Sequence, residues 1–232
     1  MTPVFGEQTE VITVKVTRDI DDGARHHLLW GYTALVYGLT AASVGGLKIW
    51  EGSIDLCKYL ITEDCVRQQL GASVFEIGCG AGLPGIVALL SGAQRNAETI
   101  EYFTKPNILA NCCAAQGDDA STVMARCQFE SGDWSQVRRT LIEHNSSHMF
   151  DLILTSETIY NTENYAKLHD LMHSTLAERG RVLLAAKSMY FGLDGSLDEW
   201  LDFVEDKKIF TAETVWTSKS SIARVIVQMR RK

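Results

Sequence analysis

Three closely spaced glycines after a short apolar run give the clearest chemical signal in this sequence. An acid near the end of the run is followed by glycines at alternate positions: Glu76, Gly78, Gly80 and Gly82. Glycines permit tight turning and close approach of a ligand to the backbone, and Pro84 suits the first turn of a helix. Such a loop places free backbone N–H groups and the positive end of a helix beside a ligand. We therefore interpret residues 74–85 as a nucleotide-binding loop.

The loop alone does not select one nucleotide. It differs from the dinucleotide fingerprint Gly-x-Gly-x-x-Gly because it carries an acid two residues ahead of the first glycine. Gly80, Gly82 and Gly85 can still be matched to that fingerprint, which leaves a nicotinamide dehydrogenase open.

Two pairs of histidines lie four residues apart, His144 with His148 and His169 with His173. The second pair imitates a zinc-protease helix, but the required glutamate is replaced by Asp170 and no third ligand is evident. The helix also has an ordinary amphipathic interpretation. We therefore expect no metal site.

The six cysteines are scattered without Cys-x-x-Cys spacing. This usage suits a reducing compartment, and it favours neither a disulfide framework nor a zinc site.

Strand-like and helix-like segments alternate along the chain. The expected strands are residues 11–16, 74–77, 126–130, 150–155 and 181–186, with β-rich runs at 210–217 and 222–229. The expected helices are residues 54–61, 86–90, 97–115 with an interruption at Pro106, 134–142, 162–177 and 197–204. This alternation predicts a parallel sheet covered on both faces, with ligands at the carboxyl ends of its strands. The last two runs would pair antiparallel.

Length and composition indicate a soluble globular protein with one α/β domain. We expect residues 1–44 to be a partly ordered lead-in and residues 45–232 to form the domain. No apolar run approaches the roughly 20 residues of a membrane span, and no secretory signal is visible. The net charge of −7 argues weakly against direct nucleic-acid binding and is compatible with a basic protein partner.

Four further stretches make the sequence resemble a known family. They are Gly45–Glu51, Ser131–Trp134, Asp151–Asn161 and Lys187–Gly192. They fall, in order, where protein-histidine methyltransferases of the seven-strand class have theirs. From about Gly45 onward the chain resembles the methyltransferase-like 18 family, and Leu154–Asn161 is far more specific than the glycine loop. The resemblance implies a class I, Rossmann-like methyltransferase fold, a mostly parallel sheet with an antiparallel C-terminal hairpin, and S-adenosylmethionine as cofactor. It implies as substrate a histidine of ribosomal protein L3, methylated on its tele nitrogen.

The same resemblance assigns a set of residues to the cofactor pocket. They are Ile49, Trp50, Glu51, Gly52, Ser53, Glu76, Gly78, Cys79, Gly80, Gly82, Gly132, Asp133, Trp134 and Ser156. S-adenosylmethionine carries a sulfonium, an amine and a carboxylate, so carboxylates, backbone amides and aromatic faces all have groups to bind. Trp134 would stack near the adenine, with Asp133 or a backbone amide meeting its exocyclic amine. Trp134 as the first apolar residue of its helix, and Trp50 as a core anchor, remain alternatives.

The resemblance is interrupted after Gln94. Family members have a further segment here that ends in the acid binding both ribose hydroxyls, whereas Gln94 runs directly into Arg95 in this sequence. We therefore expect the second strand of the sheet to be shortened or missing, together with that acid. Glu98 or Glu101 could substitute, although both fall within the expected helix 97–115, where a solvated position is the alternative.

The implied reaction is attack of a neutral imidazole nitrogen on the methyl group. Free histidine has a pKa of about 6.5 and is largely neutral at cellular pH, so the enzyme must position one nitrogen and bind the other. We expect Glu157 to accept the imidazole N–H, with Tyr160 or Asn161 shaping the pocket. A helix cap or a pair with a lysine is the alternative for Glu157.

The leading hypothesis is a monomeric, cytoplasmic and nuclear, or nucleolar, protein-histidine methyltransferase. Its partner would be a ribosomal protein or a ribosome-assembly intermediate. We expect it to bind neither a membrane nor a specific nucleic-acid sequence directly. A related protein-lysine methyltransferase and a binding protein that has lost the cofactor are the alternatives.

Overall fold

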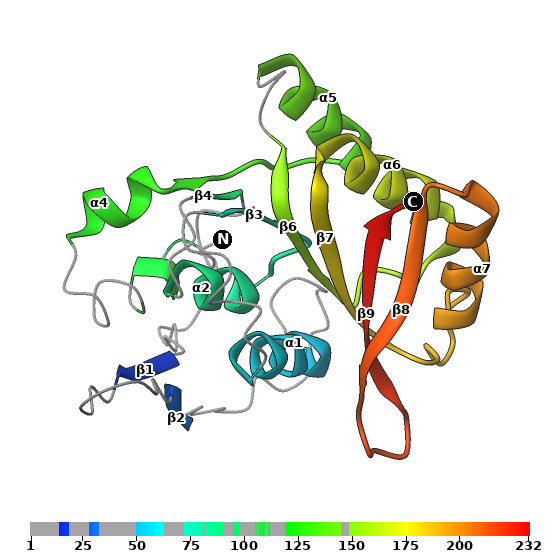
Figure 1. Cartoon of the computed structure of the whole chain (residues 1–232), viewed down its shortest axis with the longest axis horizontal. Coiled ribbons are helices and arrows are strands. Elements are labelled where there is room, and N and C mark those ends of the chain that lie inside the picture. The colour runs from blue at the N-terminus through cyan, green and yellow to red at the C-terminus, as the bar shows by residue number, and fades with distance from the viewer. Residues whose placement is uncertain are drawn as a thin grey trace, which may run out of the picture.

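The computed structural model describes residues 14–18, 28–32, 50–62, 72–80, 82–90, 95–97, 105, 107–109, 111, 119–144 and 149–232. A seven-stranded sheet organises this part of the chain (Figure 1). Its order is β5 (Cys127–Gln128), β4 (Arg95–Ala97), β3 (Ser73–Ile77), β6 (Phe150–Ser156), β7 (Leu176–Lys187), β9 (Arg224–Arg231) and β8 (Phe210–Thr217). The strands from β5 to β7 are parallel, and β9 is antiparallel to both β7 and β8. The predicted parallel sheet with an antiparallel C-terminal hairpin is confirmed.

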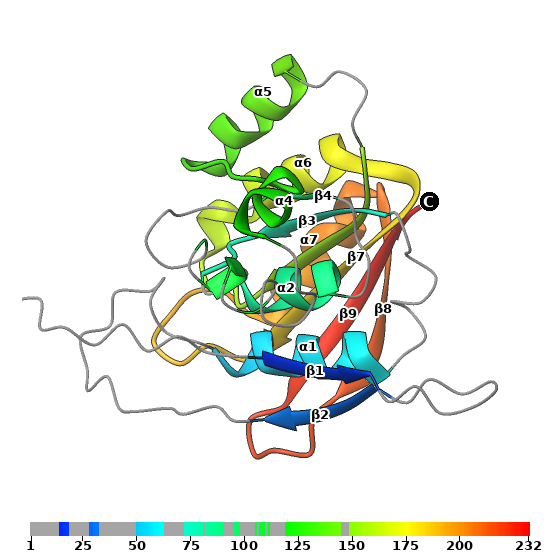
Figure 2. The same cartoon turned by 90° about the vertical axis from the view of Figure 1, so that its left-hand side faces the viewer.

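Helices cover both faces of the sheet. The helices α1 (Glu51–Thr62) and α2 (Leu83–Leu90) pack on one face, and α5 (Trp134–His144), α6 (Tyr165–Thr175) and α7 (Leu197–Lys207) pack on the other. Figure 2 shows α1 and the pair α5 and α6 on opposite sides of the strands. Along β7 the side chains alternate between the two faces, since Leu183 and Ala185 contact the α1 layer while Val182 and Leu184 face α6 and α7. Both faces are therefore buried, as the apolar runs predict.

The second strand of the sheet is present but short. The sequence left open whether this strand was shortened or missing, and the structure shows that it is shortened. β4 contains three residues, and its Asn96 pairs parallel with Val74 of β3. Ala97 is therefore strand, not the start of the predicted helix. Without a second strand, the backbone groups along one edge of β3 would lack hydrogen-bond partners. Residues 95–97, directly after Gln94, provide those partners. The next residue in the sequence is Glu98, which lies outside the described residues together with Glu101.

Two elements depart from the predicted boundaries. β7 begins at Leu176 directly after α6, although the sequence predicted a helix to residue 177 and a strand from residue 181. Gly180 permits this path because a Cβ there would lie 2.9 Å from the Phe150 carbonyl oxygen. The helix α4 (Ala120–Ala125) was not predicted, and Asp119 caps it by accepting from the amides of Ser121 and Thr122.

A separate two-stranded antiparallel sheet is formed by β1 (Val14–Arg18) and β2 (Leu28–Tyr32). The sequence predicted a strand near β1 but none at β2. The proposed domain boundary at residues 44–45 lies outside the described residues and stays a prediction.

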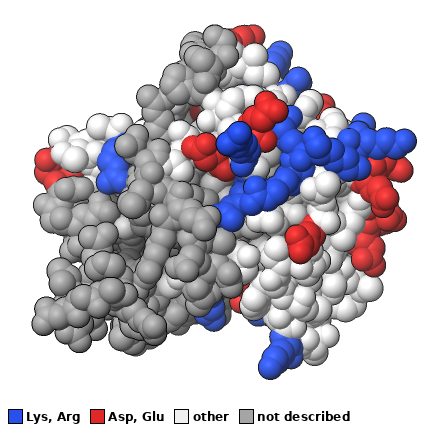
Figure 3. Space-filling model, viewed as in Figure 1, with Lys and Arg blue, Asp and Glu red and all other residues white. Residues whose placement is uncertain are grey.

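Charge is unevenly distributed over the sheet. Figure 3 shows a band of lysine and arginine side chains on one part of the molecule, over the end of β9 and the start of β8. The exposed basic residues there are Lys207, Lys208, Arg230 and Lys232. Because β9 runs antiparallel to β7, this band lies at the amino-terminal edge of the parallel strands. Among the described residues, no helix has the length and apolarity needed to cross a membrane.

Candidate functional site

The glycine loop lies at the carboxyl end of β3, and its backbone requires glycine. Gly78, Gly80 and Gly82 have φ values of 71°, 52° and 72°, which is the left-handed region that side chains disfavour. A Cβ at Gly78 would also lie 2.9 Å from the Thr158 side chain on the loop after β6. The loop therefore has the conformation that the sequence pattern predicted.

Glu76 ties this loop to the start of α2. The Glu76 side chain is buried, and its Oε2 accepts from the Gly85 amide at 2.8 Å. It lies close enough to Cys57 that its charge, added to burial of the thiol, raises the pKa of Cys57. Glu76 thus holds the shape of the loop, in addition to any direct contact with a cofactor.

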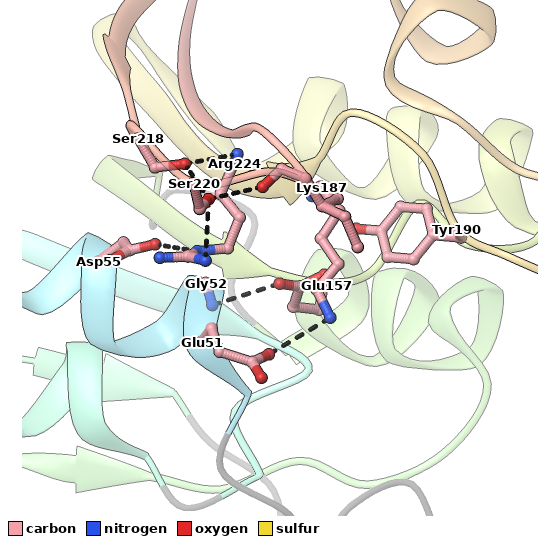
Figure 4. A network of polar contacts seen from close by, with 10 residues as sticks. Glu51, Gly52, Asp55, Glu157, Lys187, Tyr190, Ser218, Ser220 and Arg224 are labelled. Carbon is pink, nitrogen blue, oxygen red and sulfur yellow. Dashed lines mark hydrogen bonds and ion pairs between the residues drawn. The ribbon is translucent and has the colours of Figure 1, made fainter.

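The first turn of α1 meets the carboxyl end of β6. The Gly52 amide donates to Glu157 Oε1 at 3.2 Å (Figure 4), and the hydroxyls of Ser53 and Ser156 lie 2.6 Å apart. The structure therefore brings together four residues that the sequence analysis placed in one site, although they are about a hundred positions apart in the chain.

Glu157 is held in a strained conformation. Its φ is 55°, in the left-handed region, which costs a non-glycine residue roughly 1–3 kcal/mol. Its amide donates to the Ala185 carbonyl of β7 at 2.9 Å, which fixes the backbone beside the strand end. The strained residue is therefore anchored from both α1 and β7.

The Glu157 carboxylate is buried and only partly satisfied. Burial raises its pKa, while the Tyr190 hydroxyl, the charge of Lys187 and the Gly52 amide act in the opposite direction. Its second oxygen, Oε2, is buried and makes no hydrogen bond of normal geometry with any described residue. A buried acceptor without a partner costs about 1–3 kcal/mol. Oε2 is thus a buried acceptor without a well-formed hydrogen bond, although the Tyr190 hydroxyl acts on the same carboxylate.

Lys187 connects the start of α1 to this carboxylate. Its Nζ lies 3.3 Å from Glu51 Oε2 (Figure 4) and 5.3 Å from the centre of the Trp50 ring. One helical turn further along, Arg224 of β9 pairs with the buried Asp55. Contacts with β6, β7 and β9 therefore fix the first turns of α1 over the ends of these strands.

Tyr190 is a functional candidate that the sequence analysis did not name. Its hydroxyl points toward Glu157 and accepts from the Lys187 amide at 3.3 Å, and burial raises its pKa (Figure 4). Its ring meets the exposed Tyr160 ring edge to face, with centroids 6.5 Å apart. The signal was present, since Tyr190 lies within the family stretch Lys187–Gly192.

Asn161 has a local role in the structure. Its Oδ1 accepts from the Glu163 amide at 2.8 Å and caps the short helix η2 (Thr162–Asn164). Asn161 therefore shapes the loop after β6, and its side-chain oxygen is already used.

The predicted adenine-binding segment lies at the start of α5. Asp133 accepts from the Ser135 amide at 2.9 Å and pairs with Lys167 at 2.7 Å. The pKa of Asp133 is lowered, mainly by the hydrogen bond from Lys167 and also by the Ser135 amide. Trp134 is half-buried and packs against the apolar core of that face, and Gly132 has a φ of 141°. These contacts are those of a helix start, so the alternative for Trp134 stays open. Ile49 lies outside the described residues.

His169 and His173 both lie against the ring of Phe210, and His148 of the other histidine pair lies outside the described residues. His169 is fully buried against the rings of Phe203 and Phe210. In the part of the chain that the structure describes, no group of three or more His, Cys, Asp or Glu could hold a metal ion. Cys57 is a buried free thiol.

Comparisons with known proteins agree with this architecture. A sequence profile of the family described as lysine methyltransferase matches residues 38–193. The "Histidine protein methyltransferase 1 homolog" of Rattus norvegicus is 35% identical over 206 residues, covering 80% of this chain and 56% of the relative. The protein of the same description from Dictyostelium discoideum is 37% identical over 186 residues, covering 78% of this chain and 55% of the relative. The chain thus spans about half the length of these relatives.

Solved structures support the fold alone. A Burkholderia thailandensis 1,6-didemethyltoxoflavin-N1-methyltransferase with bound S-adenosylhomocysteine matches with a TM-score of 0.57 and 13% identity, covering 78% of this chain and 79% of that one. This likeness identifies the seven-stranded sheet as that of the class I methyltransferases.

Proposed function

Because the chain belongs to the family described as lysine methyltransferase, we propose that it transfers a methyl group from S-adenosylmethionine to a histidine side chain of a protein. The family places the chain among methyltransferases, and the relatives named as histidine protein methyltransferases support histidine as the acceptor. The structural observation that carries the proposal is Glu157 Oε2 at the strand ends, a buried carboxylate oxygen without a well-formed hydrogen bond.

The residues at the strand ends fit the cofactor. The left-handed glycines 78, 80 and 82 form the turn before α2 without side chains, and Gly78 is exposed there. At this helix start, N–H groups and the helix dipole favour the carboxylate of the methionine part. When bound, S-adenosylmethionine supplies an electrophilic methyl group on a positively charged sulfur. Gly78, Gly80, Gly82 and the first turn of α1 would hold it.

Glu157 supplies what a histidine acceptor needs. Its Oε1 is fixed by the Gly52 amide, so the carboxylate cannot rotate freely, and Oε2 is left to accept an imidazole N–H. Accepting that hydrogen bond selects the tautomer whose other nitrogen carries the lone pair. As the ring gains positive charge, the nearby carboxylate stabilises it, and the ring returns to neutrality by losing the same N–H proton.

The acceptor's own pKa separates histidine from lysine, the residue in the family's description. A histidine is neutral above a pH of about 6.5, whereas a lysine must first lose a proton with a pKa of about 10.4. With a histidine acceptor the rate should level off near neutral pH. With a lysine acceptor it should keep rising by about tenfold per pH unit through the same range.

The finer assignment is a histidine of ribosomal protein L3, methylated on its tele nitrogen, in the cytoplasm or nucleus. This finer assignment rests on the resemblance carried by Leu154–Asn161, since the relatives' descriptions name histidine but no substrate protein and no compartment. The presence of β4 weakens the alternative of a binding protein without cofactor, because the sheet that supports the cofactor loop is complete across β3.

The test uses the full chain, S-adenosylmethionine with a labelled methyl group, and purified ribosomal protein L3. Mass spectrometry of the product should show one methylated histidine, and a Glu157→Gln variant should lower the rate by about 10²–10⁴-fold at unchanged cofactor affinity. Methylation at lysine would favour the alternative acceptor. Absence of S-adenosylmethionine binding in a calorimetric titration would overturn the proposal.

A further inference from the structure

Exposed apolar side chains are concentrated beside the proposed acceptor site. Seven large apolar residues are exposed in the described part of the chain, and four of them come from Tyr160 and from the loop between β7 and α7. Their exposed fractions are 44% for Tyr160, 55% for Met189, 74% for Phe191 and 55% for Leu193. We refer to these four residues as the apolar patch. A cluster of this kind on a protein surface marks an interaction site more often than chance exposure.

The loop that carries the patch is held in place. Its base is closed by a bridge between Met189 and Ser196, and the Leu193 amide donates to the Tyr190 carbonyl at 3.3 Å. The Asp194 carboxylate accepts from the Thr162 hydroxyl at 2.7 Å. The apolar side chains are therefore presented to solvent by a fixed backbone.

The patch is continuous with the site. The Gly195 amide donates to the Tyr160 carbonyl at 3.1 Å, and a Cβ at Gly195 would lie 2.3 Å from the Ile159 carbonyl oxygen. The loop thus crosses directly over the segment that follows Glu157. Tyr190 turns its hydroxyl inward to Glu157 (Figure 4), while its neighbours Met189 and Phe191 are exposed.

The charged residues around the patch are acidic. Glu163, Asp194 and Glu199 are exposed. Asp194 accepts from the Thr162 hydroxyl, and Glu199 accepts from the hydroxyl of Ser196 in the loop that carries the patch. Lys187 is paired with Glu51. The basic band of Figure 3 lies at the opposite edge of the sheet, so a positively charged partner is favoured here.

We propose that the apolar patch docks the protein substrate, binding an apolar side chain that lies near the methylated residue in a basic segment. This inference rests on the proposed function, because it takes the segment at Glu157 as the acceptor site. The patch contributes to substrate affinity, and the acidic residues around it select for basic segments.

The test uses two short lysine-rich peptides that each contain one histidine, one with a leucine near it and the other with a serine in that place. Binding is measured by fluorescence anisotropy with the wild-type chain, Phe191→Ser, Leu193→Ser and the control Met149→Ser, an exposed apolar residue outside the patch. The wild type and the control should bind the leucine peptide about tenfold more tightly than the serine peptide, and the two patch variants should bind both equally. The exposed positions should leave thermal unfolding unchanged.

Turnover separates this inference from the proposed function. In the wild type, methylation with a lower KM for the leucine peptide and a similar kcat supports both. If neither peptide is methylated but the binding difference holds and is lost in Phe191→Ser, the proposed function fails and the docking surface stands. Equal binding of the two peptides by the wild type overturns the docking surface. A wild-type dimer in light scattering that Phe191→Ser converts to a monomer would overturn it too, since a second copy would then occupy the patch.

Discussion

The backbone amide of Gly52 donates to Glu157 Oε1 at 3.2 Å, and a Cβ at position 52 would lie 2.7 Å from the same oxygen. The first turn of α1 therefore positions the carboxylate in two ways, by a hydrogen bond and by contact. The backbone of Gly52 has ordinary helical geometry, so its conformation does not require glycine. Glycine is needed at position 52 because a side chain there would collide with the Glu157 carboxylate.

Replacing Gly52 with alanine should displace the Glu157 carboxylate. Because a misplacement of about 1 Å can cost a rate factor of about 10², kcat/KM for protein methylation should fall by about 10–100-fold. Thermal stability should fall little, because alanine is favoured over glycine within a helix by about 0.5–1 kcal/mol, which offsets part of the clash. Lys58→Ala, an exposed change on the same helix, is the control and should keep the wild-type rate. An unchanged rate in Gly52→Ala would remove the positioning role of this contact.

Replacing Glu157 with glutamine should separate stability from activity. Burial raises the pKa of Glu157, so the folded state holds its proton more tightly than the unfolded chain does. The stability that this proton contributes is present at acid pH and is lost as the pH rises from about 4.5 through the folded pKa. At neutral pH the variant should be at least as stable as the wild type while its methylation rate falls. Urea unfolding of both proteins between about pH 4 and pH 7 measures this; a variant that is less stable at neutral pH would contradict it.

The apolar pattern of the chain predicted the sheet because both of its faces are buried. The strand Phe150–Ser156 has three successive apolar residues, Leu152 to Leu154, and a sheet covered on both sides buries all three. The prediction failed where a local contact decided the structure. Gly180 lets β7 start early against the Phe150 carbonyl, and no spacing of residues reveals that contact.

Some of the predicted site residues contact one another in the structure, whereas their assignment to a cofactor or acceptor site stays a prediction. The sequence placed Gly52 and Glu157 in one site, but the positive φ of Glu157 and the contact with Tyr190 depend on segments distant in the chain. Asp133 and Asn161 each accept a hydrogen bond from the backbone amide two residues further along. Asp and Asn often form such turns, so their residue types alone would have been enough to predict this contact.

His169 should make the fold sensitive to mild acid. It is fully buried, and burial lowers its pKa although Asp170 acts in the opposite direction. Below a pH of about 6.5 the unfolded chain therefore binds a proton before the folded chain does, and stability falls as the pH falls, until the folded pKa is reached.

A His169→Leu variant should lose this dependence. Between about pH 7.5 and pH 5.5 the free energy of unfolding of the wild type should fall by up to about 1 kcal/mol more than that of the variant. Urea midpoints at the two pH values measure the difference. His173→Gln is the matched comparison one turn along, and it should have a smaller effect because His173 is less buried. Equal pH dependence in wild type and His169→Leu would show that other groups are responsible.

The position of β4 makes Glu98 the leading candidate for the acid that binds the ribose. In the methyltransferases that this chain resembles, that acid ends the second strand, and here the second strand ends at Ala97 with Glu98 next in the sequence. Hydrogen bonds to a charged acceptor contribute about 1.5–3 kcal/mol each. Glu98→Gln should therefore weaken S-adenosylmethionine binding by about 10–100-fold in a calorimetric titration. Glu101→Gln, three residues further along, is the control and should bind as the wild type does. If Glu101→Gln weakens binding and Glu98→Gln does not, the acid has moved further from the strand end; if neither does, the ribose is held without a carboxylate from this segment.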